Sequence, residues 1–226
     1  MNCNFFAYCA TWIAQILFCV SLFPQIKLNY QLKTVSGCSD FFLIGYLNGY
    51  ITYIYYVYFL HFPLAYKVMV PIACVLIFII LFQRFYYSEF KRKDKFWAWV
   101  YILNISLALL IFPFTINNSY LVGTFCGWLM LFIWATYQIP QLIKCFSEKS
   151  VYGFSFALVS LIALGEVVEL LGALALGLPF PTIINNFRGI LIYLVFCVQF
   201  LFYKSFQIEK VNLFIKRINV FSNIDI

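Results

Sequence analysis

Long apolar stretches recur along the chain and are separated by short polar segments. A helix that crosses a bilayer needs about 20 mainly apolar residues, and seven stretches come close to this length. No basic segment precedes the first stretch, so it is interpreted as a retained helix and not as a cleaved signal peptide. The pattern predicts an all-α membrane protein with transmembrane helices at Phe5–Phe23, Phe41–Leu60, Val68–Tyr87, Phe96–Phe114, Tyr120–Ile143, Phe154–Leu178 and Ile183–Tyr203.

The composition agrees with this pattern. Of the 226 residues, 65% are hydrophobic, 22% are aromatic and only 10% are charged. In an ordinary soluble domain about a quarter of the residues are charged. A single soluble core would not hide this excess of apolar side chains, so the bilayer is the expected solvent for most of the chain.

The basic residues gather on one side of the predicted membrane. The net charge of +7 would suit a nucleic-acid partner, but in a membrane protein the positions of Lys and Arg carry more information than their sum. Only Lys67 and Arg188 fall on the side of the even-numbered connections. The bias predicts an extracytoplasmic or lumenal N-terminus, a cytoplasmic C-terminus and no nucleic-acid partner, without indicating which membrane. Thirteen basic residues lie on the predicted cytoplasmic side: Lys27, Lys33, Arg84, Lys91, Arg92, Lys93, Lys95, Lys144, Lys149, Lys204, Lys210, Lys216 and Arg217.

Two polar segments suit contact with lipid. The basic run at residues 91–95 is expected to meet anionic headgroups. Residues 205–226 are predicted to form a cytoplasmic tail, in which residues 205–221 have the pattern of an amphipathic helix that lies on the membrane surface.

The chain contains an internal repeat with an offset of 116 residues. The two units cover residues 5–87 and 120–204, with three spans each, and the span at 96–114 links them. Because three is odd, the linker must cross the membrane once more before the second unit can start in the same orientation. This predicts parallel repeats in a 3+1+3 arrangement, one of the repeat classes of secondary transporters. The offset aligns Trp12 with Trp128, Pro24 with Pro140, Gln25 with Gln141, Lys33 with Lys149, Gly37 with Gly153, Ser39 with Ser155 and Gly49 with Gly165.

The matched segments resemble a known family. Residues 22–26 (LFPQI) and 33–39 (KTVSGCS), with 139–142 (IPQL) and 149–155 (KSVYGFS), are similar to the twin motifs of the PQ-loop family. The seven-span layout resembles its cystinosin-like branch of lysosomal amino-acid transporters. The resemblance implies a secondary transporter that moves a small polar solute, such as an amino acid or related metabolite, by alternating access.

The two Pro-Gln pairs are candidate gating hinges. A proline inside a helix removes one backbone donor, so Pro24 and Pro140 are expected to bend their helices. The family resemblance implies that these bends open and close a cytoplasmic gate, while Gln25 and Gln141 bond to the freed backbone groups. The alternative is a structural kink without a gating role.

Two acidic residues lie deep in the sixth predicted span. Ionisable groups inside a bilayer are costly, so Glu166 and Glu169 are expected to face the bundle interior or a water-filled cavity. They are three residues apart on one helix face, and their repulsion would favour uptake of a proton by one of them. They therefore predict proton coupling or recognition of a cationic solute; the alternative is a buried acid satisfied by a Tyr or Asn.

Three more residues complete the predicted site. Asn48 precedes Gly49, the repeat mate of Gly165, which favours a site at the membrane midplane between the halves, although a hydrogen bond between helices explains Asn48 equally well. Arg188 opens the last span and either receives an anionic group or reaches to lipid headgroups. In the cystinosin-like branch an aspartate of the last helix is important for proton coupling, and Tyr193 stands at the matching position. Any proton coupling would thus fall to Glu166 or Glu169.

Other classes of protein fit less well. The sequence has no Ser-His-Asp set, P-loop, Gly-rich dinucleotide turn or C-x-x-C pair, so neither an enzyme nor a metal site or other cofactor is expected. The partners expected are the solute, membrane lipids and, if coupling exists, protons. Two alternatives share the predicted layout: a SWEET-type sugar facilitator, and a peptide-binding receptor similar to the KDEL receptor.

Overall fold

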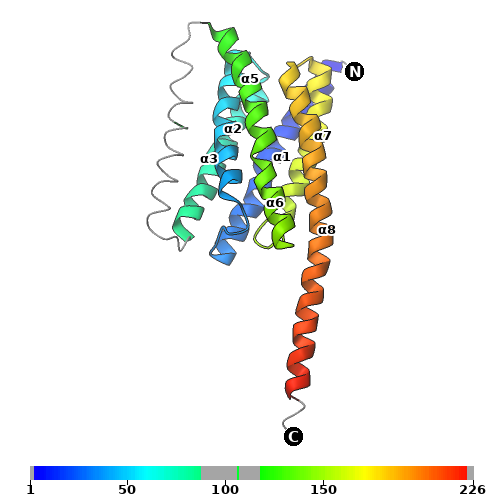
Figure 1. Ribbon diagram of the computed structural model, residues 1–226. Coiled ribbons are helices and arrows are strands. Elements are labelled where there is room, and N and C mark those ends of the chain that lie inside the picture. The colour runs from blue at the N-terminus through cyan, green and yellow to red at the C-terminus, as the bar shows by residue number, and fades with distance from the viewer. Residues whose placement is uncertain (1–2, 88–105, 107–117, 223–226) are drawn as a thin grey trace.

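The computed structural model describes residues 3–87, 106 and 118–222, with side chains for 5–87, 106 and 118–203. These residues form a bundle of helices (Figure 1). The predicted span at Phe96–Phe114 and the basic run at 91–95 lie outside the described residues, apart from Ser106. The helices are α1 (Cys3–Leu32), α2 (Asp40–Phe59), α3 (Leu64–Tyr87), α5 (Ser119–Thr136), α6 (Gln138–Glu148), α7 (Phe156–Leu176) and α8 (Phe180–Ser222).

Most of these helices are suited to a bilayer. Within the described residues, five stretches are long and apolar enough to span a membrane: Phe5–Leu32, Leu64–Tyr87, Ser119–Glu148, Phe156–Leu176 and Phe180–Tyr203. The predicted span at Phe41–Leu60 corresponds to α2, which has 20 residues, six of them tyrosine, and is not among these five stretches. Large apolar side chains such as Phe82, Phe132 and Leu191 are about two-thirds exposed, at 65%, 66% and 65%, as expected for surfaces that face lipid.

The two repeats exchange partners in the core. The offset of 116 residues relates α1 to α5 and α6, α2 to α7, and α3 to α8. The most extensive packing between the halves joins α1 to α7 and α2 to α5. The first helix of each repeat thus packs against the second helix of the other repeat, which is the pattern that a pseudo-twofold axis between the halves produces.

Paired glycines permit this close packing. A Cβ atom on Gly49 of α2 would lie 1.8 Å from the indole nitrogen of Trp134 in α5. A Cβ on Gly165 of α7 would lie 2.6 Å from the ring of Phe18 in α1. Gly165 is the repeat mate of Gly49, and Trp134 is the repeat mate of Phe18. Each half therefore inserts an aromatic ring against a glycine of the other half.

The first helix of each repeat ends in the same way. Lys33 after α1 and Lys149 after α6 have φ of 52° and 46°, the left-handed conformation that commonly terminates helices. The next helix of each repeat begins with a serine cap. The Ser39 side chain accepts from Phe42 N at 3.1 Å, and Ser155 accepts from Leu158 N at 3.3 Å.

The two prolines differ in their effect on the backbone. α1 continues as one helix through Pro24, whereas α5 ends at Thr136 and α6 begins at Gln138. Pro140 has no N–H for the carbonyl of Thr136, four residues earlier, so one helical hydrogen bond is missing there. Tyr137, between the two helices, keeps helical torsions with φ of −68° and ψ of −24°. A junction between two helices is thus present at the second proline and not at the first, and the bends expected at both prolines stay a prediction.

The last helix extends beyond the bundle. α8 runs without a break to Ser222, past the end of the predicted span at Tyr203, and its C-terminal part projects from the other helices (Figure 1). The amphipathic helix predicted on the membrane surface at residues 205–221 is therefore not a separate element: the backbone has it as a continuation of α8.

The glycine contacts generate a stability prediction. Gly49→Ala should destabilise the protein by about 1–3 kcal/mol, because the new methyl group overlaps the rigid ring of Trp134. Gly172→Ala is the control, since its Cβ would come no closer than 3.0 Å, to the methyl group of Thr11. The thermal unfolding midpoint of the purified protein in detergent should fall clearly for Gly49→Ala and little for Gly172→Ala; equal changes would contradict this packing.

Candidate functional site

A cavity lies between the two repeats, with walls from α1, α2, α5, α6, α7 and α8. Four residues of the predicted site line it: Glu166, Glu169, Arg188 and Tyr193. The other lining residues are Gln15, Phe18, Tyr46, Tyr50, Tyr53, Trp134, Tyr137, Gln138, Ile162 and Asn185.

Glu169 bonds across the interface between the halves. Its side chain is only 3% exposed. Its Oε1 accepts hydrogen bonds from Gln15 Nε2 in α1 and from the Tyr53 hydroxyl in α2, both at 3.1 Å. Tyr53 is the repeat mate of Glu169, so this pair joins equivalent positions of the two repeats. A carboxylate of the second repeat is thus held by two donors of the first.

Glu166 is held within its own repeat. It is 6% exposed, and its carboxyl group lies against the backbone of α8, where a Cβ on Gly189 would be 2.3 Å from its Cδ. With its amide nitrogen turned toward them, Asn186 donates to Glu166 Oε2 at 3.3 Å and to Thr182 O at 3.2 Å. The two glutamates share a helix face but have partners from different halves. Neither faces lipid.

Arg188 points into the bundle. The sequence places it at the start of the last span, but α8 begins at Phe180, so Arg188 lies about two turns inside the helix. Its Nη1 donates to Trp134 O at 2.6 Å and to Gln138 Oε1, and its Nη2 donates to Asn185 Oδ1 at 2.9 Å. The guanidinium group therefore braces the junction between α5 and α6, where it binds a carbonyl in the last turn of α5. The alternative, in which Arg188 reaches to lipid headgroups, is not what the structure shows.

Tyr193 belongs to an aromatic layer that lines the cavity. Its side chain is 1% exposed, and its hydroxyl lies 3.5 Å from that of Tyr137, which also accepts from Gln138 Nε2 at 3.1 Å. The Tyr137 ring stacks on Tyr46 with a centroid distance of 5.4 Å. This layer presents hydroxyl groups and ring faces to the cavity.

Asn48 lies outside this cavity. It is buried, and its Oδ1 accepts from the Ser106 hydroxyl at 3.2 Å. The contact agrees with the alternative interpretation of Asn48 as a hydrogen bond between segments. We therefore leave Asn48 out of the candidate site.

The two glutamines of the Pro-Gln pairs close one end of the bundle. We call this the PQ end; α1 and α6 finish there, and α2 and α7 begin there. Gln25 Nε2 donates to Gly153 O at 2.9 Å, and Gln25 Oε1 accepts from Ser155 N at 2.8 Å. Gln25 thus makes two hydrogen bonds to the backbone of the other repeat's loop.

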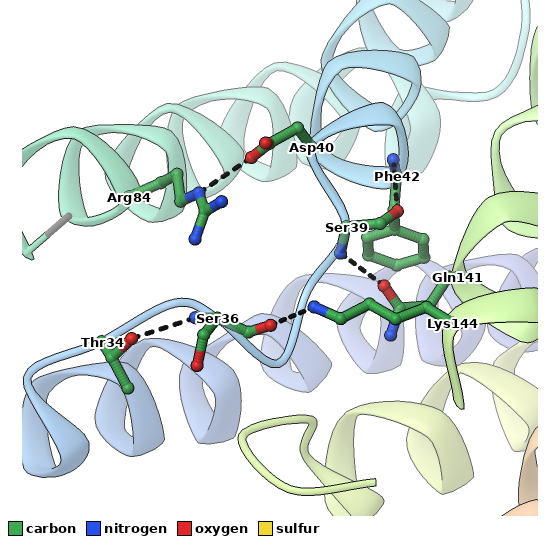
Figure 2. A network of polar contacts seen from close by, with 8 residues as sticks. All are labelled: Thr34, Ser36, Ser39, Asp40, Phe42, Arg84, Gln141 and Lys144. Carbon is green, nitrogen blue, oxygen red and sulfur yellow. Dashed lines mark hydrogen bonds and ion pairs between the residues drawn. The ribbon is translucent and has the colours of Figure 1, made fainter. Parts of the chain in front are cut away.

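Gln141 makes the equivalent bonds in the opposite direction. Its Nε2 donates to Gly37 O at 2.9 Å. Its Oε1 accepts from Ser39 N at 2.6 Å, the bond drawn in Figure 2. These four bonds form a reciprocal clasp, because Gly37 and Ser39 are the repeat mates of Gly153 and Ser155. The expectation that each glutamine satisfies the backbone freed by its own proline is therefore wrong: each amide bonds to the other half.

Further polar contacts surround the clasp. Lys144 donates to Ser36 O in the loop of the first repeat (Figure 2). Arg84 at the end of α3 forms an ion pair with Asp40 at the start of α2, with 2.8 Å between Nε and Oδ1. These contacts lie nearer the bundle surface and add to the closure.

Glycine is required where the two loops meet. A Cβ on Gly37 would lie 2.1 Å from the carbonyl carbon of Gly153, and Gly153 itself has φ of 75°. Cys38, next to Gly37, is only 1% exposed. Burial raises the pKa of the Cys38 thiol to about 12, although Lys144 acts in the opposite direction. Burial at the closed PQ end and the raised pKa therefore predict slow reaction of this loop thiol.

Some of the missed residues left a signal in the sequence. Gln15 and Gln138 are amides inside apolar stretches, the same signal that drew attention to Asn48. Tyr46, Tyr50 and Tyr53 recur at spacings of four and three residues and so share one face of α2. In the described part of the chain, no group of three or more His, Cys, Asp or Glu side chains is placed to hold a metal ion.

The clasp generates a prediction about thiol reactivity. Gln141→Ala removes two bonds that flank Cys38, so alkylation of Cys38 by N-ethylmaleimide at pH 7 should become about tenfold faster. In the unsubstituted protein the rate should still rise between pH 7 and pH 9, because a thiol with a raised pKa gains thiolate throughout that range. The Cys38→Ser variant gives the background from the other cysteines, and Ser147→Ala, an exposed change on α6, is the control. An unchanged rate in Gln141→Ala would contradict the role of the clasp.

Comparisons with known proteins identify the family. A family model described as PQ loop repeat matches residues 6–66 and 122–182, together more than half of the chain and separated by the same offset of 116 residues. Seven chains of solved structures match, among them a eukaryotic SWEET transporter with a TM-score of 0.67 and 16% identity, over 91% of this chain and 100% of that one. No curated protein matches the sequence. The resemblance seen in the twin motifs is thus confirmed, and the chain is an integral membrane protein that belongs to the PQ-loop repeat family.

Proposed function

We propose that this protein is a secondary transporter that moves a small polar solute, an amino acid or a related metabolite, across a membrane by alternating access. One observation carries the proposal: a cavity with charged walls lies between two symmetric halves, and a clasp of hydrogen bonds closes it at the PQ end. The PQ-loop family and the SWEET-like fold support a carrier of small solutes. An arrangement of this kind can expose one site to each side of the membrane in turn.

The charges of the cavity suit a zwitterion. Glu166 and Glu169 can accept hydrogen bonds from an ammonium group, and Arg188 can bind a carboxylate. Arg188 has five N–H donors, and its contacts with Asn185, Trp134 and Gln138 use four of them. Within the described part of the chain, one donor is left for a solute. A buried charge is stable only when it is paired, so a solute that carries both signs fits this site better than an apolar one.

The proposed topology follows the basic residues. The N-terminus would be extracytoplasmic or lumenal, and the PQ end would face the cytoplasm, because thirteen of the fifteen Lys and Arg residues fall on that side. Residues 5–87 and 120–204 would be the two moving units, and the segment at 96–114 would be the linker helix that completes seven spans.

Proton coupling is part of the proposal. A carrier that takes up protons with its solute needs a group inside the membrane that changes charge. Glu166 and Glu169 are the carboxylates that line the cavity in the described part of the chain. We assign coupling to this pair, because Tyr193 occupies the position at which the cystinosin-like branch has its aspartate.

A second candidate is a sugar facilitator. The likeness to a SWEET transporter and the aromatic rings of Tyr50, Tyr53 and Trp134, which meet edge to face at 5.7 Å and 5.2 Å, favour it. Ring faces of this kind suit the C–H surfaces of sugars. Such a facilitator has no need of two buried carboxylates, so the effect of removing them separates the two candidates.

Transport by reconstituted protein tests the proposal. A thermal-shift screen against amino acids, sugars and nucleosides selects the solute, since a bound ligand raises the apparent stability. Uptake of that labelled solute into liposomes should be stimulated by an inwardly directed proton gradient. Glu166→Gln should reduce this uptake about tenfold or more, because it removes a charged partner from the cavity.

The control is Leu171→Val, a change of similar size on the lipid-exposed side of α7. Uptake of a sugar that is indifferent to the gradient and to Glu166→Gln would favour the facilitator. A protein that binds a peptide tail and moves none of these solutes would instead be a receptor, and the transport proposal would be wrong.

A further inference from the structure

The two Pro-Gln motifs match in sequence but differ in what surrounds them. α1 passes through Pro24 as one helix, whereas in the second repeat α5 ends and α6 begins on either side of Tyr137, which keeps helical torsions three residues before Pro140. Both glutamines make the same bonds across the clasp. The difference therefore lies in how each motif is tied to its own repeat.

In the first repeat the polar groups behind the motif are fully paired. Gln25 Nε2 donates to Asn29 Oδ1 at 2.7 Å, Asn29 Nδ2 donates to Gln83 Oε1 at 3.0 Å, and Gln83 Nε2 donates to Ile26 O at 3.0 Å. This chain of amides joins α1 to α3. Each side-chain oxygen and nitrogen in it has a partner, and buried networks of this kind are rigid when they are complete.

In the second repeat the same network is incomplete. The repeat mates of Gln25, Asn29 and Gln83 are Gln141, Cys145 and Gln199. Gln199 Nε2 donates to Leu142 O at 3.1 Å, as Gln83 does to Ile26 O, but the buried Gln199 Oε1 has no donor within the described part of the chain. Gln141 Nε2 lies 3.5 Å from Cys145 Sγ, and a thiol is a weak partner. Because Cys145 replaces the middle amide, the series of hydrogen bonds between amides is broken there. α6 is therefore bonded less firmly to α8 than α1 is to α3.

Arg188 holds the junction from the side. It bonds to Trp134 O in the last turn of α5 and to the side chain of Gln138 at the start of α6. The repeat mate of Arg188 is Ile72, which has no side-chain donor. The junction, where Tyr137 N keeps its helical bond to Ile133 O at 3.0 Å, is therefore also supported by side-chain bonds that can be exchanged, and the equivalent part of α1 has no such bonds from Ile72.

From these differences we infer that the two motifs have unequal roles. The junction of α5 and α6 is the hinge of the PQ end, whereas α1 does not bend and keeps its position against α3. The inference rests on the proposed function, because a hinge at the PQ end serves alternating access. Opening would then swing α6 and its Gln141 away from the loop of the first repeat. Cys145 is a positioning residue, because its weak hydrogen bond with Gln141 leaves α6 free to move.

Two equivalent positions allow the motion to be compared directly. Tyr30 in the last turn of α1 and Phe146 in the last turn of α6 are repeat mates, and both side chains are well exposed, at 61% and 69%. A trifluoromethyl-phenylalanine placed at either position reports its surroundings by ¹⁹F NMR in the full chain reconstituted in nanodiscs. We expect two exchanging resonances from the probe at Phe146 and one from the probe at Tyr30.

Reciprocal substitutions at the equivalent positions of the two repeats supply the control. Cys145→Asn gives the second repeat the amide that the first has, so it should merge the two Phe146 resonances into one and slow the alkylation of Cys38 by N-ethylmaleimide about tenfold. Asn29→Cys creates the same deficit in the first repeat and should give a second resonance at Tyr30. The two residues are similar in size, so both variants are expected to fold.

A single resonance at Phe146 in the unsubstituted protein, or paired resonances at Tyr30 as well, would overturn the inference. So would a Cys145→Asn variant with unchanged resonances and alkylation. The NMR and alkylation measurements do not depend on solute uptake, so a negative result in them would not contradict the transport proposal. A protein that moves a solute but shows equal behaviour at the two probes has two equivalent hinges.

Discussion

The structure depends on an exchange of hydrogen bonds between the two repeats. The loop of each repeat has a buried carbonyl and a buried or partly buried N–H, and both are satisfied by the glutamine of the other repeat. Buried backbone groups without partners are costly, so neither loop can hold its conformation alone. The closed PQ end is thus a joint property of both halves. Opening it requires water or another group to replace four bonds that the halves make together.

This exchange of hydrogen bonds sets the geometry of the cavity between the repeats. The loops can approach only because Gly37 and Gly153 have no side chains, and the helices behind them can pack only where Gly49 and Gly165 admit an aromatic ring. Such contacts fix the distance between the halves near the PQ end. Deeper in the bundle, polar bonds take over, with Glu169 held by Gln15 of the other repeat. The cavity therefore lies between a tightly packed end and a region of exchangeable polar contacts.

The sequence predicted the repeat better than it predicted the site. The offset of 116 residues and the twin motifs follow from identities that can be counted, and the family match has the same offset. An offset shows which residues are equivalent but not which ones meet, so the crossed bonds of Gln25 and Gln141 could not be foreseen. Hydropathy likewise predicts how deep a residue lies in the membrane but not which way its side chain points. Asn48 was at a plausible depth but bonds to Ser106. Arg188 lies deeper than predicted, because α8 starts before the predicted span, and its side chain points into the bundle. These outcomes depend on tertiary contacts.

Duplication explains why a symmetric fold has an asymmetric cavity. Tyr50 and Tyr53 in α2 are the repeat mates of Glu166 and Glu169 in α7, and all four line the cavity. One wall therefore offers hydroxyl donors and ring faces, and the opposite wall offers carboxylates. The symmetry of the backbone permits both halves to close on one solute, while the difference between the walls gives that solute a preferred orientation. Equal walls would bind a polar solute in either of two directions, whereas under the proposed function these unequal walls would place its positive group against α7.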